Sequence, residues 1–242
     1  MLHRWLKLGL VVLLAGLVVV WVLLMMKPEQ NATLSYKIIS PLQNITLDQV
    51  EDQIWPYLEQ SFWDVDLVGL QQVLQLNPWV ESAFVSKQWP NQLVLKLVER
   101  EPVARWRQQS LVDRQGVIFN PDDVAAFGHL VVLDAHELQS RAMLRHWSEV
   151  QALLNPLDWQ VLGMTWFADD VLKVDVDAGH QIYLIASDKK QLVQRFMLAW
   201  PKLSDSTVQP VILNSALKQS ARWKIDLRYS NGMALNPLNN VD

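Results

Sequence analysis

The chain lacks cysteine altogether, and this absence removes several kinds of site at once. Without cysteine there is no disulfide, and the Cys-based zinc and redox motifs are excluded. An exported domain does not need disulfides when its hydrophobic core is large enough, and half of the 242 residues are hydrophobic. The missing cysteine is therefore compatible with export.

Glycine is also scarce, with eight residues, and the sequence contains neither a Gly-rich phosphate loop nor a G-x-S-x-G motif. The five histidines show no paired spacing of the H-E-x-x-H kind. Two Ser-x-x-Lys matches lack the S-D-N and K-T-G motifs that accompany them in penicillin-binding enzymes: Ser187 with Lys190, and Ser215 with Lys218. The aspartate pairs are interpreted as solvated surface rather than a glycosidase site: Asp122 and Asp123, Asp169 and Asp170, Asp175 and Asp177. The sequence thus predicts no enzyme, no cofactor and no metal site.

An excess of positive charge is missing too, because the formal net charge is −4. Nucleic-acid binding requires a basic face that neutralises phosphates. We therefore expect no nucleic-acid partner.

One long hydrophobic run lies near the N-terminus. Residues 8–26 carry no charge over 19 positions, and as a helix they would span about 28 Å, close to the thickness of a bilayer's hydrocarbon core. Arg4 and Lys7 precede the run, which favours a cytoplasmic N-terminus. The alternative is a cleaved signal peptide, but such a peptide has a shorter apolar region that ends in small residues. We expect a cytoplasmic tail over 1–7 and a transmembrane helix over 8–26.

A linker over 27–32 leads to a first unit over 33–102. A capping box at Thr46-x-x-Gln49 opens one helix, and Asp66 precedes another. The hydrophobic pattern predicts a strand, two helices and two strands, over residues 34–39, 47–58, 67–77, 80–89 and 93–97. Such a β-α-α-β-β unit packs two helices on one face of a small sheet.

A second unit over 103–236 is expected to be a mostly antiparallel β domain with two helices, followed by a tail over 237–242. Gly116 supplies the turn of a strand-turn-strand segment over 111–119. Further patterns predict helices over 138–154 and 189–203, and strands over 159–167, 172–176, 182–186 and 223–229. The predicted fold class is therefore α+β, with a single N-terminal transmembrane helix.

Asn231-Gly232, near the end of this unit, leaves two interpretations open. The pair forms either a tight hairpin turn or a bulge within one longer strand. Because only Met233, Ala234 and Leu235 are apolar before Asn236-Pro237, we favour a kinked continuation of the strand.

Two distant segments carry specific motifs. The first comprises Asn77-Pro78-Trp79-Val80, Ala83, Val85, Trp89-Pro90, Leu93, Glu99 and Pro102-Val103-Ala104-Arg105-Trp106. The second is Asp226-Leu227-Arg228-Tyr229-x-x-Gly232-x-Ala234, and an Asp-x-x-Gly-x-x-Phe segment ending at Phe119 lies between the two. These motifs resemble the FtsQ/DivIB family of bacterial cell-division proteins, and the β-α-α-β-β order resembles the family's POTRA domain. Trp79, Trp89 and Trp106 are expected to pack in cores or at corners.

The resemblance implies a scaffold in the inner membrane, with its N-terminus in the cytoplasm and its C-terminus in the periplasm, at the division septum. It implies that the last strand holds FtsB and FtsL by strand addition, that the POTRA unit contacts FtsK or other division proteins, and that the chain links early and late division proteins. The residues expected to bind the partner are Arg228, Tyr229, Ser230, Gly232, Met233, Ala234 and Leu235, with Arg195 as a charged contact at the rim. Trp223, Ile225 and Leu227 are expected in the core.

Two rival functions remain open from the sequence. A POTRA-containing adaptor of outer-membrane assembly or secretion would carry repeated POTRA units or a barrel, whereas this chain has one such unit. A membrane-tethered cell-wall enzyme would require a catalytic constellation, such as Ser187 beside Lys190 in a pocket.

Overall fold

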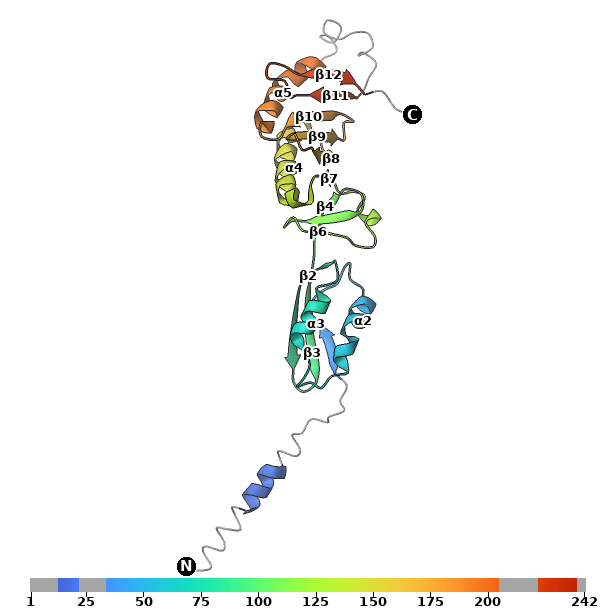
Figure 1. The fold of residues 1–242 in the computed structure, drawn as a ribbon, viewed down its shortest axis with the longest axis vertical. Helices are drawn as coiled ribbons and strands as arrows, with labels where there is room; N and C mark the ends of the chain where they lie inside the picture. The colour runs from blue at the N-terminus through green and yellow to red at the C-terminus, as the bar shows by residue number, and fades with distance from the viewer. Residues whose placement is uncertain (1–12, 22–33, 205–221, 239–242) are drawn as a thin grey trace, which may run out of the picture. The chain divides into compact units, whose positions relative to one another are not determined.

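The structure, a computed structural model, describes residues 13–21, 34–204 and 222–238 (Figure 1). Residues 13–21 are helical and exposed. Among the described residues no helix is both long and apolar enough to cross a membrane. Most of the predicted transmembrane helix, residues 8–26, lies outside the described residues, so this helix stays a prediction.

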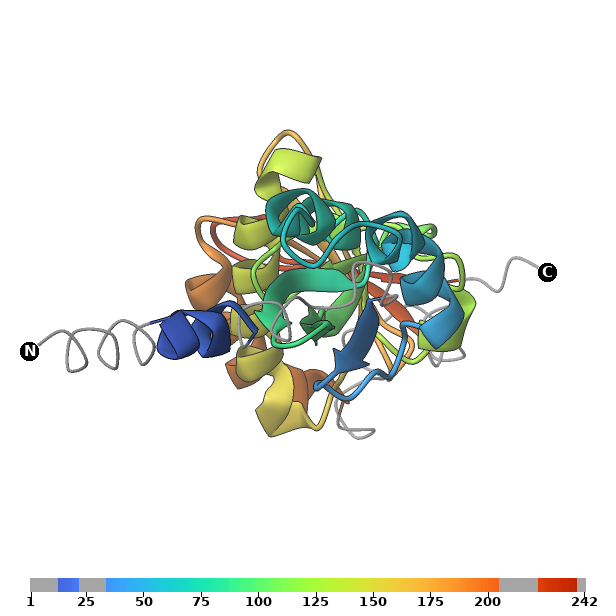
Figure 2. The ribbon, with the colours of Figure 1, turned by 90° about the horizontal axis from the view of Figure 1, so that it is seen from below.

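The described chain forms two compact units, divided between Arg100 and Glu101. The first unit has the predicted β-α-α-β-β order. Its three strands pair in the order β1-β3-β2, with β3 central, and α2 and α3 lie on one side of them (Figures 1 and 2). The elements are β1 Ser35–Ile38, α2 Leu47–Leu58, α3 Leu67–Leu74, β2 Val80–Gln88 and β3 Gln92–Glu99.

Both helices of the first unit begin where the capping residues predict. The Thr46 side chain accepts a hydrogen bond from the Gln49 N–H, and the Gln49 side chain accepts one from the Thr46 N–H. The Asp66 carboxylate accepts from the Gly69 N–H. These contacts satisfy amides that have no partner within the helix.

Trp89 corrects the prediction that all three motif tryptophans are packed. Trp79 and Trp106 are buried, but Trp89 is 70% exposed. It follows the last residue of β2, at the turn into β3. Its place at a turn explains why its large apolar surface does not reach the core.

The second unit is built on a nine-stranded sheet with the order β12-β11-β10-β9-β8-β7-β4-β5-β6. Five of its strand pairs are antiparallel, and the pairs β4–β7, β7–β8 and β10–β11 are parallel. The strands are β4 Pro102–Trp106, β5 Ser110–Asp113, β6 Ile118–Phe119, β7 Val132–Asp134, β8 Val161–Trp166, β9 Val171–Val176, β10 Gln181–Ile185, β11 Trp223–Asp226 and β12 Ala234–Pro237.

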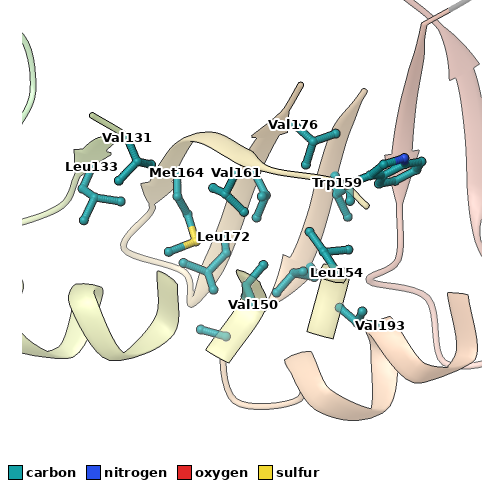
Figure 3. Close-up of a cluster of buried hydrophobic side chains, with 14 of the residues drawn as sticks. Val131, Leu133, Val150, Leu154, Trp159, Val161, Met164, Leu172, Val176 and Val193 are labelled. Carbon is teal, nitrogen blue, oxygen red and sulfur yellow. The ribbon is translucent and has the colours of Figure 1, made fainter. Parts of the chain in front are cut away.

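Helices α4 (Ser140–Leu154) and α5 (Lys189–Ser204) cover one face of this sheet (Figure 1). Between the helices and the strands lies a hydrophobic core, to which Val150 and Leu154 contribute from α4 and Val193 from α5 (Figure 3). Leu133 and Leu172 face them from the sheet, both without exposed surface. The alternation of buried residues along β9 and β10 places the remaining side chains of these strands on the opposite, helix-free face.

The end of the chain corrects a second prediction. Asn231-Gly232 does not continue one strand, because β12 runs antiparallel to β11, with Ile225 opposite Leu235 and Asp226 opposite Ala234. The connection covers residues 227–233, with a turn at Ser230 and Asn231. Three apolar residues suffice for the returning arm because Met233 and Leu235 pack against the existing core.

Candidate functional site: the β11–β12 hairpin

Strand β12 forms one end of the nine-stranded sheet, and no described strand pairs with its outer side. The Leu238 N–H donates to the Arg222 carbonyl at 3.0 Å, which fixes the hydrogen-bonding phase of the ladder. Bonded and non-bonded pairs alternate in an antiparallel ladder, so the opposed pair Ile225 and Leu235 is a non-bonded one. The N–H and C=O groups of Leu235 therefore point outward. Pro237, which has no N–H, falls at the other outward position, as expected at an edge.

The side chains of β12 divide between the two faces of the sheet. Leu235, opposite the fully buried Ile225, is half-buried and packs against the core together with Met233. Ala234 and Asn236 lie on the helix-free face. A second chain paired with β12 would thus meet a short backbone edge with an apolar side and a polar side.

Arg195 on α5 holds the loop that connects the two strands. Its guanidinium donates to four backbone carbonyls, those of Tyr229 at 2.6 Å, Ser230 at 2.5 Å, and Leu227 and Gly232 at 3.2 Å each. The loop's other end is tied to the sheet by the Leu227 N–H, which donates to the Tyr183 carbonyl at 2.8 Å. Arg195 therefore positions the predicted partner-binding residues, and a direct contact with the partner stays a prediction.

Arg228 is held by Asp226, which belongs to the second sequence motif but was not among the residues expected to bind the partner. The Asp226 carboxylate accepts two hydrogen bonds from the Arg228 guanidinium, from Nε at 2.9 Å and Nη2 at 2.7 Å. This contact lowers the pKa of Asp226 and raises that of Arg228. Asp226 is the last residue of β11, and Arg228 lies in the loop that follows, where its N–H also donates to the Asp226 carboxylate at 3.1 Å. Opposite charges two residues apart in the motif were the available signal. Tyr183 adds an aromatic face, with Lys224 Nζ 4.5 Å from its ring centre.

The start of β11 is fixed by a buried histidine. The Trp223 N–H donates to His180 Nδ1 at 3.1 Å, so His180 must be neutral at that atom. Its ring contacts Trp159 and Trp200, with centroids 4.9 and 5.2 Å away. Burial in this aromatic cluster lowers the pKa of His180.

The predicted site residues therefore gather around one hairpin with different exposures. Tyr229 is 55% exposed, and Arg228 and Ser230 are exposed as well. Gly232, Met233, Ala234 and Leu235 are half-buried. Trp223, Ile225 and Leu227 lie in the core, as predicted.

Among the residues considered for catalysis, the Asp170 carboxylate accepts a hydrogen bond from the Ser187 N–H at 3.1 Å, at an exposed position. Ser187 and Lys190 are both exposed, and Ser215 and Lys218 lie outside the described residues. The Asp175 carboxylate pairs with Lys173 at 3.2 Å, and that of Asp177 accepts from the Gln160 N–H. Within the described residues, no group of three or more His, Asp or Glu side chains is placed to hold a metal ion.

The architecture is that of a two-unit α+β protein, in which a small three-stranded unit precedes a sheet whose last hairpin leaves an edge open. Two known protein families match these two units. Residues 37–100 match the family described as POTRA domain, FtsQ-type, and residues 104–228, more than half of the chain, match Cell division protein FtsQ/DivIB, C-terminal. The chain belongs to the FtsQ/DivIB family of cell-division proteins.

Several curated relatives bear the name Cell division protein FtsQ. The protein of Coxiella burnetii is 25% identical over 94% of this chain and 87% of its own length. That of Haemophilus influenzae is 25% identical over 92% and 84%, and that of Aliivibrio fischeri 27% identical over 94% and 85%. The family match ends at Arg228, so the loop beyond it and β12 are assigned to the site by the open sheet edge.

Proposed function

We propose that the chain is a non-enzymatic scaffold of the bacterial division complex, and that it captures an extended segment of FtsB, held together with FtsL, by strand addition to β12. The observation that carries the proposal is the outward-facing backbone of Leu235 on a strand with no described neighbour on that side. Strand addition uses such unpaired N–H and C=O groups for affinity and neighbouring side chains for specificity. Arg228, Tyr229, Ser230, Gly232, Met233 and Ala234 supply those neighbouring contacts, with Arg195 beneath them.

In this proposed role the scaffold is anchored in the inner membrane. Residues 1–7 lie in the cytoplasm, residues 8–26 cross the inner membrane, and both folded units lie in the periplasm at the septum. The apolar run and the preceding Arg4 and Lys7 support this arrangement. The POTRA unit over 33–102 and the β domain over 103–236 then link early and late division proteins, with FtsK a partner of the former.

The experiment compares Leu235→Pro with Leu235→Ala in binding to the periplasmic parts of FtsB and FtsL. Both substitutions remove the leucine side chain, but only proline also removes the outward N–H. Because Leu235 is in a non-bonded pair, proline leaves the bonds between β11 and β12 in place. We expect Leu235→Pro to bind markedly more weakly than Leu235→Ala.

Tyr229→Ala and Met233→Glu test the neighbouring side chains in the same assay. Both are expected to weaken binding while the circular dichroism spectrum stays that of the parent chain. Equal binding by the proline and alanine variants would show that β12 does not accept a strand. If all four variants folded and bound FtsB and FtsL as well as the parent chain, the binding site would have to lie elsewhere in the protein.

A further inference from the structure

A cavity lined by three arginines lies at the end of the nine-stranded sheet opposite β12. Its volume is about 410 Å³. Arg114 contributes from the turn between β5 and β6, and Arg141, Leu144, Arg145 and Glu149 contribute from α4. Because β6 and β12 form the two ends of the sheet order, this cavity is separate from the hairpin site (Figure 1).

The walls of the cavity are fixed by contacts between the β5–β6 turn and the first turn of α4. Ser140 Oγ donates to the Gly116 carbonyl at 2.6 Å, and Arg141 Nε donates to the Gln115 carbonyl at 2.7 Å. Gly116 has a φ of +80°, and a Cβ at this position would lie 2.4 Å from Arg141 Cγ. The missing side chain thus lets the stem of Arg141 lie against the turn that also carries Arg114.

The cavity carries an excess of positive charge that neighbouring acids do not offset. Its one acidic residue, Glu149, binds Lys189 Nζ at 2.7 Å, and this contact lowers the pKa of Glu149. Arg114 lies 3.7 Å from Glu101, and both side chains are more than 70% exposed. Arg145 forms no hydrogen bond or ion pair within the described part of the chain. Three guanidinium groups around one cavity are a local exception in a chain of net charge −4.

We propose that this cavity binds an acidic peptide segment of another protein. Arg141 and Arg145 are one helical turn apart on α4, and each guanidinium matches a carboxylate with two parallel hydrogen bonds. Leu144, half-buried against the core, lies beside them and offers an apolar contact. A peptide with carboxylates around one apolar side chain uses all of these groups, whereas a phosphate group leaves Leu144 without a role.

The second site does not depend on strand addition at β12. The first site recognises backbone groups at an edge, and the second recognises carboxylates at the opposite end of the same sheet. The chain then offers two binding surfaces in one unit. A division protein bound at one end leaves the other end accessible.

The test uses the full-length chain in a non-ionic detergent and a fluorescein-labelled eight-residue peptide that carries three glutamates around one leucine. Fluorescence anisotropy at low salt should show binding of this peptide and none of its twin with glutamine in place of glutamate. Adding salt should weaken binding, because the charges are exposed. The variant Arg114→Gln/Arg141→Gln/Arg145→Gln should bind at least about tenfold more weakly, since three exposed ion pairs are removed.

Two further variants make the result specific. Arg114→Gln/Arg145→Gln spares the Arg141 contact with the turn, so its expected loss of binding is independent of folding. Lys37→Gln/Lys96→Gln/Lys190→Gln removes the same charge at exposed positions outside the cavity and should bind like the parent chain. Leu235→Pro should also leave peptide binding unchanged, which separates this site from the proposed FtsB site.

Several outcomes would overturn the proposal. Equal losses in the cavity variant and in the lysine variant would mean that only net charge matters. Displacement of the peptide by inorganic phosphate at an equimolar concentration would identify a phosphate site. If vesicles containing phosphatidylglycerol bound through the three arginines and displaced the peptide, the arginines would instead be a membrane-binding surface.

Discussion

Replacing Arg195 by alanine tests whether this residue positions the hairpin loop or contacts the partner. In the structure its guanidinium donates to four carbonyls between Leu227 and Gly232. Hydrogen bonds from charged groups contribute about 1.5–3 kcal/mol in favourable cases. Because the side chain is half-buried and two of the four contacts are 3.2 Å long, we expect a total near the lower end, about 2 kcal/mol.

A loss of about 2 kcal/mol corresponds to a roughly 30-fold larger open population of the loop. Hydrogen–deuterium exchange, followed by mass spectrometry of peptides covering 227–233, measures this population directly. The Leu227 amide, which is bonded to Tyr183 in the closed loop, should exchange faster in Arg195→Ala. FtsB binding should fall in parallel, because the partner must then order the loop as it binds.

Arg195→Lys and Lys190→Ala are the controls for this prediction. Lysine keeps the charge but not the planar fork, so it should restore only part of the protection. Lys190 is exposed on the same helix, and its removal should change neither exchange nor binding. If Arg195→Ala abolished FtsB binding while exchange over 227–233 stayed at the parent rate, the positioning argument would be refuted in favour of direct contact.

Three further predictions concern the fold around the site. Leu133→Ala should lower the free energy of unfolding, measured with urea, by about 3 kcal/mol, because Leu133 is fully buried in the core. The control Leu162→Ala, at a position 56% exposed on β8, should change this free energy little. Burial lowers the pKa of His180 from its ordinary 6.5, so the unfolded chain protonates this imidazole more readily than the folded chain does. The free energy of unfolding should therefore decrease as the pH is lowered below 6.5. Thermal unfolding of His180→Leu should lose that part of the pH dependence, although the Trp223 N–H then lacks its acceptor; an unchanged pH profile would contradict the assignment. The Arg228 contact lowers the pKa of Asp226 below 3.8, so its stabilisation is present above pH 3.8 and is lost as pH falls further. Asp226→Asn should therefore be less stable than the parent at pH 7, with the difference shrinking in acid; a constant difference between pH 7 and pH 2 would contradict it.

Local sequence signals predicted the first unit well because each of its elements carries its own start and stop. The capping box at Thr46, the cap at Asp66 and the strand alternation before and after Pro90 depend on neighbours within a few residues. Trp89 was wrongly expected to be packed, because it stands at the turn after β2 and its side chain is exposed.

The second unit was harder to predict where its strands are short or parallel. Strand β7 has three residues and joins β4 to β8 through parallel pairing, a long-range arrangement without a local turn signal. The hairpin at Asn231-Gly232 was the less favoured of two interpretations for a related reason. Counting apolar residues after Asn231-Gly232 underestimated the returning arm, because Met233 and Leu235 use a core already formed by other strands.

The Arg195 contacts show a further limit of sequence reasoning. Its partners are backbone carbonyls more than 30 residues away, and carbonyls have no sequence signature. Arg228 and Asp226, by contrast, are two residues apart in one segment, and their contact depends on near neighbours in the sequence. Residue types thus identified the candidate segment, while the tertiary fold determined its hairpin form and how it is held.

The length of β12 limits how a partner binds. The strand has four residues, and of its two outward positions only Leu235 has an N–H, since the other is Pro237. Such a short edge resists unspecific pairing with other chains, but it also offers few backbone hydrogen bonds to the intended one. Most of the binding energy must then come from side chains beside the strand, where Tyr229 is 55% exposed on the loop that Arg195 holds. The partner segment should accordingly contact the loop over 227–233 as well as the strand, and a peptide trimmed to the strand-pairing part alone should bind far more weakly than one that reaches Tyr229.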